Sequence, residues 1–254
     1  MTAQLRKLAR QFTTTHNTQF KNLLVSGCSL TYNNSDKYIC SWPYYLRDLA
    51  GFDEVYDCSQ SGAGSNHIFN SIINEIETNP DINANNTLVV IMWTGLTRTD
   101  VIAEQEITSP WHFMSNYHFD DRYATLSLFN GVDGMSSLAQ LCRRYKKLVS
   151  SDAQVYESLI KIIALKAYLD QKGFKLFMVS WQDLMPDFKN ATIKQSIIES
   201  ALSTLNNIPY LYWYAESKKQ IEPNDGHPTP NGYLGWTREH LLPGLESVGY
   251  VTKL

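Results

Sequence analysis

A serine near one end of the chain and a histidine near the other carry the clearest chemical signal. Ser29 comes two residues after the apolar run 22–27, where a buried strand would end in a tight turn. His227 comes two residues after Asp225. A hydroxyl, an imidazole and a carboxylate are the nucleophile, base and orienting acid of a serine hydrolase. The sequence therefore predicts a catalytic triad of Ser29, His227 and Asp225.

Alternating strands and helices must position these groups. Strands are expected at 22–27, 54–58, 88–93, 174–180 and 208–213, with helices at 42–50, 65–78, 152–172, 191–205 and 232–245. This alternation predicts an α/β fold, a flavodoxin-like three-layer α/β/α sandwich around a parallel sheet of about five strands. Because sites in such sheets form at the carboxyl ends of strands, Ser29 and His227 are expected to converge there.

The 254 residues suffice for one large domain. We expect a polar N-terminal extension at 1–20 and a single domain at 21–254. Within it, the segment 100–150 is irregular and rich in aromatic residues, and we interpret it as an insertion or lid. His112 and His118 are expected in the packed surface of this lid rather than in a metal site.

Four segments, in this order along 23–245, resemble the SGNH hydrolases, the GDSL-like lipase and esterase superfamily. Residues 27–31 resemble the first block, whose serine is the nucleophile. Residues 61–66 resemble the second block, where a glycine N–H helps to form the oxyanion hole. The resemblance favours Gly64 for this role, with Gly62 as the alternative. Asn66 is expected to cap a helix, as is its neighbour Ser65.

Two blocks depart from the family pattern. In the third block Thr97 stands where the family has asparagine, and Arg98 follows it. The resemblance implies an oxyanion hole made by Ser29, Gly64, Thr97 and Arg98. The fifth block is Asp-x-x-His in the family, but here Asn224 precedes the histidine by three residues and Asp225 by two. Glu222 is a further candidate for the orienting acid.

The resemblance implies a serine esterase for carboxylic esters, such as acetyl groups on a carbohydrate, without metal or cofactor. The two altered blocks support an alternative, a binding or structural module of the same fold whose catalysis is lost. Compact members with similar Gly-Cys-Ser blocks occur in bacteriophage genomes, so a virion component is one form of this alternative. A flavodoxin-like phosphate site at 26–36 ranks last, because the loop has one glycine and no basic residue before Lys37.

Composition limits the classes of binding partner that we expect for this protein. The net charge of −3 gives no reason to expect nucleic acid as a partner. No stretch approaches the roughly 20 apolar residues of a membrane helix, and the N-terminal residues lack an apolar signal core. We therefore expect a cytoplasmic location, with a virion as the alternative. The four cysteines show no CxxC spacing, so reduced thiols rather than zinc are expected. A small-molecule or glycan ester is the expected partner, and an oligomer or virion assembly stays open.

Overall fold

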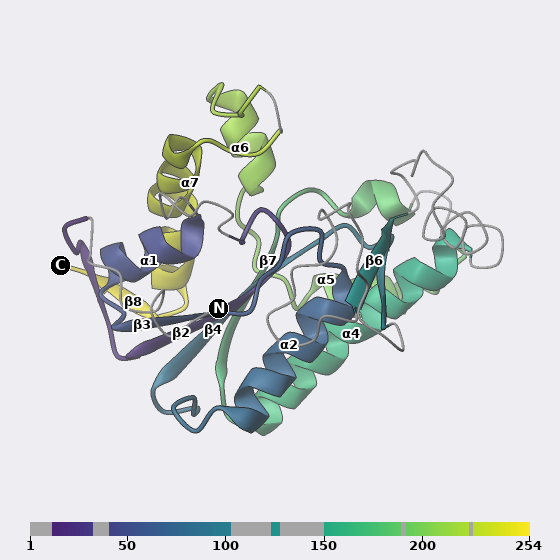
Figure 1. The fold of residues 1–254 in the computed structure, drawn as a ribbon, viewed down its shortest axis with the longest axis horizontal. Helices are drawn as coiled ribbons and strands as arrows, with labels where there is room; N and C mark the ends of the chain where they lie inside the picture. The colour runs from purple at the N-terminus through teal and green to yellow at the C-terminus, as the bar shows by residue number, and fades with distance from the viewer. Residues whose placement is uncertain (1–11, 33–40, 103–122, 128–149, 189–191, 224–225) are drawn as a thin grey trace.

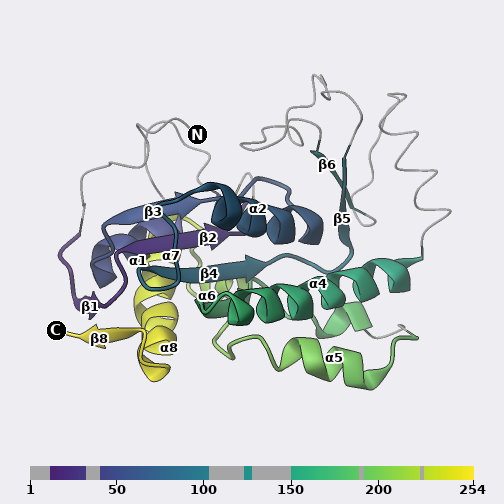
Figure 2. The same ribbon diagram turned by 90° about the horizontal axis from the view of Figure 1, so that it is seen from below.

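A four-stranded parallel sheet forms the centre of the computed structural model, which describes residues 12–32, 41–102, 123–127, 150–188, 192–223 and 226–254 (Figure 1). The strand order is β3-β2-β4-β7. The strands are β2 (Asn22–Ser26), β3 (Glu54–Asp57), β4 (Thr87–Trp93) and β7 (Lys175–Ser180). Helices cover both faces, so the predicted three-layer α/β/α sandwich is confirmed (Figure 2).

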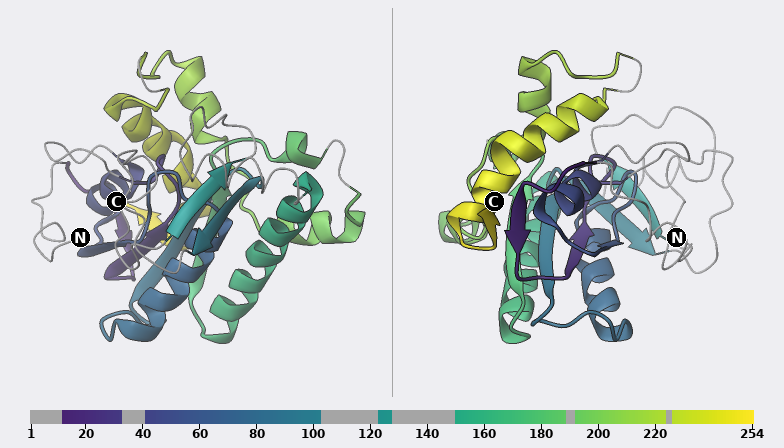
Figure 3. Two further views of the ribbon diagram at one scale, coloured as in Figure 1. Left: turned by 45° about the vertical axis from the view of Figure 1, so that its right-hand side comes forward. Right: turned by 90° about the vertical axis from the view of Figure 1, so that its left-hand side faces the viewer.

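Two helix layers enclose the sheet. One layer consists of α2 (Ser65–Thr78) and α4 (Ser151–Gln171), and the other of α1 (Trp42–Ala50), α7 (Pro230–Trp236) and α8 (Leu242–Ser247). A π-helical turn, η4 (Thr237–Leu241), joins α7 to α8 into one continuous helix (Figure 3). Pro243 follows that turn, and because proline has no N–H, the wider turn accommodates its missing hydrogen bond.

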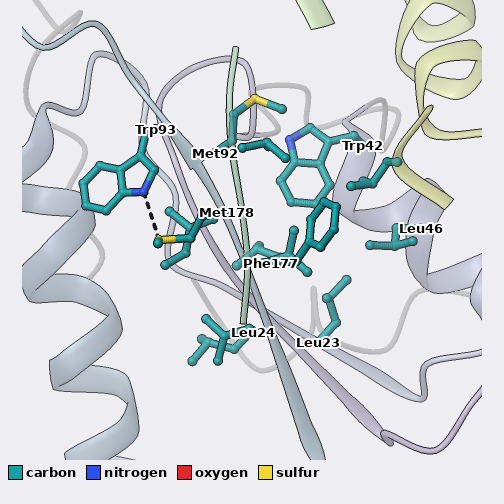
Figure 4. Close-up of a cluster of buried hydrophobic side chains, with 14 of the residues drawn as sticks. Leu23, Leu24, Trp42, Leu46, Met92, Trp93, Phe177 and Met178 are labelled. Atoms are coloured by element: carbon teal, nitrogen blue, oxygen red, sulfur yellow. Dashed lines mark hydrogen bonds between the residues drawn. The ribbon is translucent and has the colours of Figure 1, made fainter. Parts of the chain in front are cut away.

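Every residue of β2 and β4 is buried, as expected of central parallel strands covered on both faces. Alternate side chains of these strands point to opposite layers, so Trp93 and Met178 lie on one side of the sheet and Trp42 and Phe177 on the other (Figure 4). The Trp93 indole donates a hydrogen bond to the Met178 sulfur at 3.2 Å. This packing on both faces fixes where each strand ends, and therefore fixes the positions of the loops that carry the site.

The prediction of a strand at 208–213 is wrong. Pro209 has no N–H for a ladder, and the chain enters helix α6 (Leu211–Ser217) instead. Among the described residues, Asn206 pairs with the outer edge of β7, where its N–H donates to Met178 O at 2.7 Å. In return, Met178 N–H donates to Asn206 Oδ1 at 2.9 Å. The described sheet therefore has four strands, one fewer than expected.

Short elements complete the described chain. They are β1 (His16–Thr18), which pairs with β8 (Val251–Lys253), the antiparallel ribbon of β5 (Arg98–Ile102) and β6 (Tyr123–Ser127), the 3-10 turn η3 (Met185–Phe188) and α5 (Gln195–Leu202). Strand β1 belongs to the segment 1–20 that was expected to be an extension. The ribbon falls in the expected insertion, whose residues His112 and His118 lie outside the described part. No helix among the described residues is long and apolar enough to span a membrane.

Candidate active site

Ser29 and His227 meet at the carboxyl edge of the sheet. His227 Nε2 lies 2.8 Å from Ser29 Oγ, although the two residues are 198 positions apart in the sequence. Ser29 is half-buried and follows β2, so its hydroxyl is presented at the strand end. This distance is that of a hydrogen bond between a nucleophile and its general base. The structure thus brings together two of the three predicted triad residues.

The turn that carries Ser29, residues 27–31, is called here the nucleophile turn. Cys28 O accepts hydrogen bonds from the N–H groups of Thr31 and Tyr32, both at 2.9 Å. These two bonds close the turn directly after the strand. Cys28 is 1% exposed whereas Ser29 is half-buried, so the serine and not the cysteine is available to a substrate.

Gly27 is required by the packing of the nucleophile turn. A Cβ atom on Gly27 would overlap the Thr31 side chain and lie 3.0 Å from Met92 O. Thr31 is itself fully buried, and Trp42 Nε1 donates a hydrogen bond to its Oγ1 at 3.2 Å. The threonine side chain therefore cannot move away to make room for a Cβ atom on Gly27.

The segment after β3 supports the nucleophile turn from the side. Cys58 N–H donates to Val25 O at 2.9 Å, and Gln60 N–H donates to Gly27 O at 3.1 Å. Asp57 shapes this segment by accepting hydrogen bonds from the Ser59 N–H, at 2.9 Å, and from the Ser59 hydroxyl. Burial raises the pKa of the Asp57 carboxyl to about 6, although the Ser59 hydrogen bonds partly oppose the shift.

Gly64 is the N-cap residue of α2 and is buried. The N-terminal end of a helix carries partial positive charge, which suits a developing oxyanion. Gly62 precedes it with φ +80°, a conformation that favours glycine. The expectation that Ser65 or Asn66 caps this helix is wrong, because α2 begins at Ser65 and both residues lie inside its first turn.

His227 lies on a tight loop that leads into α7. Its carbonyl accepts a hydrogen bond from Glu222 N–H at 2.7 Å, and Gly226 N–H donates to Glu222 O at 3.0 Å. Thr229 then caps α7 by accepting from Gly232 N–H at 3.2 Å. Glu222 is exposed and contacts the histidine segment through its backbone. The other two candidates for the acid position, Asp225 and Asn224, lie outside the described residues.

Residues 94–98, called here the third-block loop, are held from two distant elements. Leu96 N–H donates to the Asp187 carboxylate at 3.1 Å, and the Ser158 hydroxyl donates to Leu96 O at 2.8 Å. Ser158 Oγ also lies 2.9 Å from Ser65 Oγ, next to Gly64. A chain of buried hydroxyls therefore links the second and third blocks, through a helix that the sequence analysis did not assign to the site.

Several polar atoms near the third-block loop are buried and have no hydrogen-bond partner among the residues that the structure describes. They are Thr94 Oγ1, Arg98 Nη1 and both amide atoms of Gln154, which precedes Ser158 by one turn of α4. Thr97 is buried beside them, at 5% exposure. Unsatisfied buried groups are rare in proteins and are common at functional sites. Within the described residues, no group of three or more metal-ligating side chains is close enough to hold a metal ion.

Sequence comparison finds no relative of the chain, since no protein-family model and no curated protein matches it. Solved structures that are similar include TesA, at 16% identity and a TM-score of 0.48, covering 89% of this chain and 99% of that one. A lipolytic G-D-S-L family protein from Veillonella parvula is 11% identical, with a TM-score of 0.41 and coverage of 85% and 94%. A GDSL-like lipase from Bacteroides thetaiotaomicron is 13% identical, with a TM-score of 0.39 and coverage of 90% and 89%.

Proposed function

We propose that the protein is a serine hydrolase that cleaves carboxylic esters. The observation that carries the proposal is the 2.8 Å contact between Ser29 Oγ and His227 Nε2. A serine hydroxyl at this distance from an imidazole can be deprotonated as it attacks a carbonyl carbon. The buried, tightly closed nucleophile turn supports the proposal, because it holds the hydroxyl at the strand end where substrates reach α/β sheets.

In the proposed reaction, His227 Nε2 takes the Ser29 proton while Oγ bonds to the ester carbonyl carbon. The alcohol leaves with that proton, and an acyl group remains on Ser29. Water, deprotonated by His227, then releases the acid and restores the hydroxyl. Asp225 is the proposed acid that orients His227, since Glu222 is exposed and contacts this loop through its backbone.

The proposed oxyanion hole combines the N–H groups of Ser29 and Gly64 with the side chains of Thr97 and Arg98. Two observations support it. Gly64 stands at the N-terminus of α2, whose partial positive charge faces the strand ends. The hydrogen bonds of Ser158 to Ser65 and Leu96 couple the loops that carry the proposed donors. A hydroxyl and a guanidinium then replace the carboxamide of the family pattern.

Acetyl groups on a carbohydrate are the proposed substrate within this class, and they follow from the resemblance alone. The alternative is an SGNH-fold module without catalysis, for example in a virion. The altered third and fifth blocks favour that alternative, whereas the short Ser29–His227 contact favours the enzyme. An activity-based probe separates the two, because it requires an activated serine and no knowledge of the substrate.

The test is the intact mass of the protein after exposure to a fluorophosphonate. We expect one adduct on wild type and none on Ser29→Ala, with the same melting temperature for both. Asp225→Asn should slow labelling by up to about 10⁴-fold, as in a serine protease, whereas Glu222→Gln should label at the wild-type rate. Absence of an adduct on folded wild type would refute the hydrolase and favour the binding module.

A further inference from the structure

A pocket beside the end of β7 is separate from the Ser29–His227 contact. It lies between the carboxyl end of β7, the end of α5 and the segment 203–210, and we call it the β7-edge pocket. Its volume is about 210 Å³. Because an apolar cavity of about 150 Å³ can hold benzene, this pocket has room for a group somewhat larger than a benzene ring.

The pocket lies where the described part of the chain places no fifth strand beside β7. In a parallel strand, the N–H and C=O of every second residue face the same neighbour. Met178 uses both groups toward Asn206, whereas Trp181 N–H bonds to Trp93 O on the opposite side. The N–H and C=O of Ser180 must therefore face outward, like those of Met178. Among the described residues, none pairs with these two groups of Ser180.

The Ser180 side chain adds a third polar group. It is 5% exposed and lines the pocket, and within the described part of the chain its Oγ has no hydrogen-bond partner. Leaving a buried hydroxyl unpaired is unfavourable, so this hydroxyl favours a ligand that can bond to it. An N–H donor, a carbonyl acceptor and a hydroxyl therefore meet at one residue at the pocket wall. Such a set is complementary to a group that offers both a carbonyl and an N–H.

The other residues that line the pocket indicate the charge and polarity of the rest of the ligand. Leu202, Leu205 and Ile208 supply apolar wall, while Asp183 is the charged residue of the lining. Burial, together with the Asp183 charge, raises the pKa of Tyr210, so this tyrosine remains a neutral part of the wall. A negative charge here disfavours an acidic ligand, and the apolar wall favours a short hydrocarbon substituent.

We propose that the β7-edge pocket binds a secondary amide that carries a small apolar substituent. The amide N–H donates to Ser180 C=O, and the amide carbonyl accepts from both Ser180 N–H and the Ser180 hydroxyl. Asn206 already makes the equivalent reciprocal pair with Met178, two residues earlier on the same edge. An amide ligand therefore extends a pairing pattern that the strand already uses.

The pocket also bears on the substrate, a step that rests on the proposed function. Ser180 ends β7 and Ser29 lies just after β2, and β4 alone separates these two strands, which places them about 10 Å apart at the same sheet edge. An ester held at Ser29 can thus extend into the pocket. The substrate class assigned here is an ester whose distal part bears a secondary amide, such as an acetamido group.

The test is a titration of the full-length Ser29→Ala protein, labelled with ¹⁵N, with N-isobutylacetamide and separately with isobutyl acetate. The two probes differ by an N–H in place of an oxygen, and the variant cannot turn over the ester. We expect saturable shifts at the Ser180 and Asn207 amides with the amide probe, and affinity at least about fivefold weaker for the ester, because one hydrogen bond is lost. Equal affinities, shifts elsewhere, or no saturation would overturn the proposal.

Ser180→Ala in the same background should weaken amide binding about fivefold. Ser203→Ala is the matched control, because Ser203 is exposed, bonds to Ser200 O and does not line the pocket. Unchanged affinity in folded Ser180→Ala would exclude the hydroxyl as a contact and count against the proposal. Fluorophosphonate labelling of wild type reports on Ser29 alone, so failure of the pocket and failure of the hydrolase can be told apart.

Discussion

Two loops at the same edge of the sheet are fixed in different ways. The nucleophile turn is closed mainly by residues close in sequence, since Trp42 bonds to Thr31 across 11 positions and Gly27 packs on Thr31 directly. The segment after β3 adds support through the bond from Gln60 N–H to Gly27 O. The third-block loop is held by Ser158 and Asp187, which lie 62 and 91 positions from Leu96. The proposed nucleophile is therefore positioned mainly by local packing, whereas the proposed oxyanion side depends on contacts from elements far away in the sequence.

Gly27→Ala should give the largest loss of stability, because it adds a methyl group where the nucleophile turn is packed most tightly. The added methyl overlaps Thr31 and approaches Met92 O at 3.0 Å. Overpacking a buried site typically costs 1–3 kcal/mol, and a clash with backbone should place this variant at about 3 kcal/mol or more. Chemical denaturation measures the loss in unfolding free energy.

Gly95→Ala is the control in the third-block loop. A Cβ at Gly95 meets only the end of the flexible Gln182 side chain, at 3.4 Å. We expect a cost within about 0.5 kcal/mol, as for substitutions that create no clash. Equal losses for Gly27→Ala and Gly95→Ala would contradict the contrast between the two loops.

Asp57 makes the support of the nucleophile turn dependent on pH. Burial raises the pKa of the Asp57 carboxyl in the folded protein to about 6, from 3.8 for an exposed aspartate, so the folded state favours the protonated carboxyl. The resulting stability is fully present below pH 4 and is lost as pH rises through about 6, a change of at most about 3 kcal/mol. Asp57→Asn cannot titrate at this position.

The measurement is the unfolding free energy of wild type and Asp57→Asn at several pH values from 4 to 7. All other titrating groups are shared, so they cancel in the difference between the two proteins. Relative to the variant, wild type should become less stable as pH rises. A difference that is constant over this range would show that the folded and unfolded pKa values of Asp57 are equal.

Ser158→Ala should affect the third-block loop and leave the nucleophile turn in place. The change leaves Leu96 O and the Ser65 hydroxyl without their buried partner, which should cost about 2 kcal/mol. The released loop should lower kcat for an ester by roughly tenfold to hundredfold, since small displacements of catalytic groups have effects of this size. Ser203→Ala, an exposed serine, serves as the control.

A denaturation curve combined with steady-state kinetics separates these effects. Loss of stability with an unchanged kcat would mean that Ser158 supports the helices and not the loop. A reduced kcat should be accompanied by an unchanged Ser29–His227 distance, which a crystal structure of the variant measures.

The same contrast explains what the sequence could reveal. The first strand, its turn and Ser29 were predictable because an apolar run followed by Gly-Cys-Ser is a local pattern. Ser158 could have been noticed only as a polar residue between the buried positions Val155 and Leu159 of α4. Nothing local indicates that its hydroxyl reaches Leu96, because that contact depends on how the helix docks on the sheet.

The prediction of a strand at 208–213 was wrong for a related reason. Its apolar and aromatic residues suit a strand, but Pro209 breaks the ladder and Tyr212 N–H bonds to Trp181 O instead. Asn206 then completes the edge of β7 with one side chain and one N–H. Strand propensity is a property of single residues. The structure of this segment instead depends on which residues can form hydrogen bonds with the backbone at the edge of β7.

Thr31→Val gives the smallest effect and tests the local side of the comparison most finely. Valine keeps the volume that packs against Gly27, but it cannot accept the hydrogen bond from Trp42 Nε1. The indole N–H is then buried without a partner, at a cost of about 1 kcal/mol. Trp42→Phe, added as the second leg of a double-mutant cycle, removes the donor as well. The two changes should be less than additive in unfolding free energy, and strict additivity would mean that this hydrogen bond contributes nothing to the nucleophile turn.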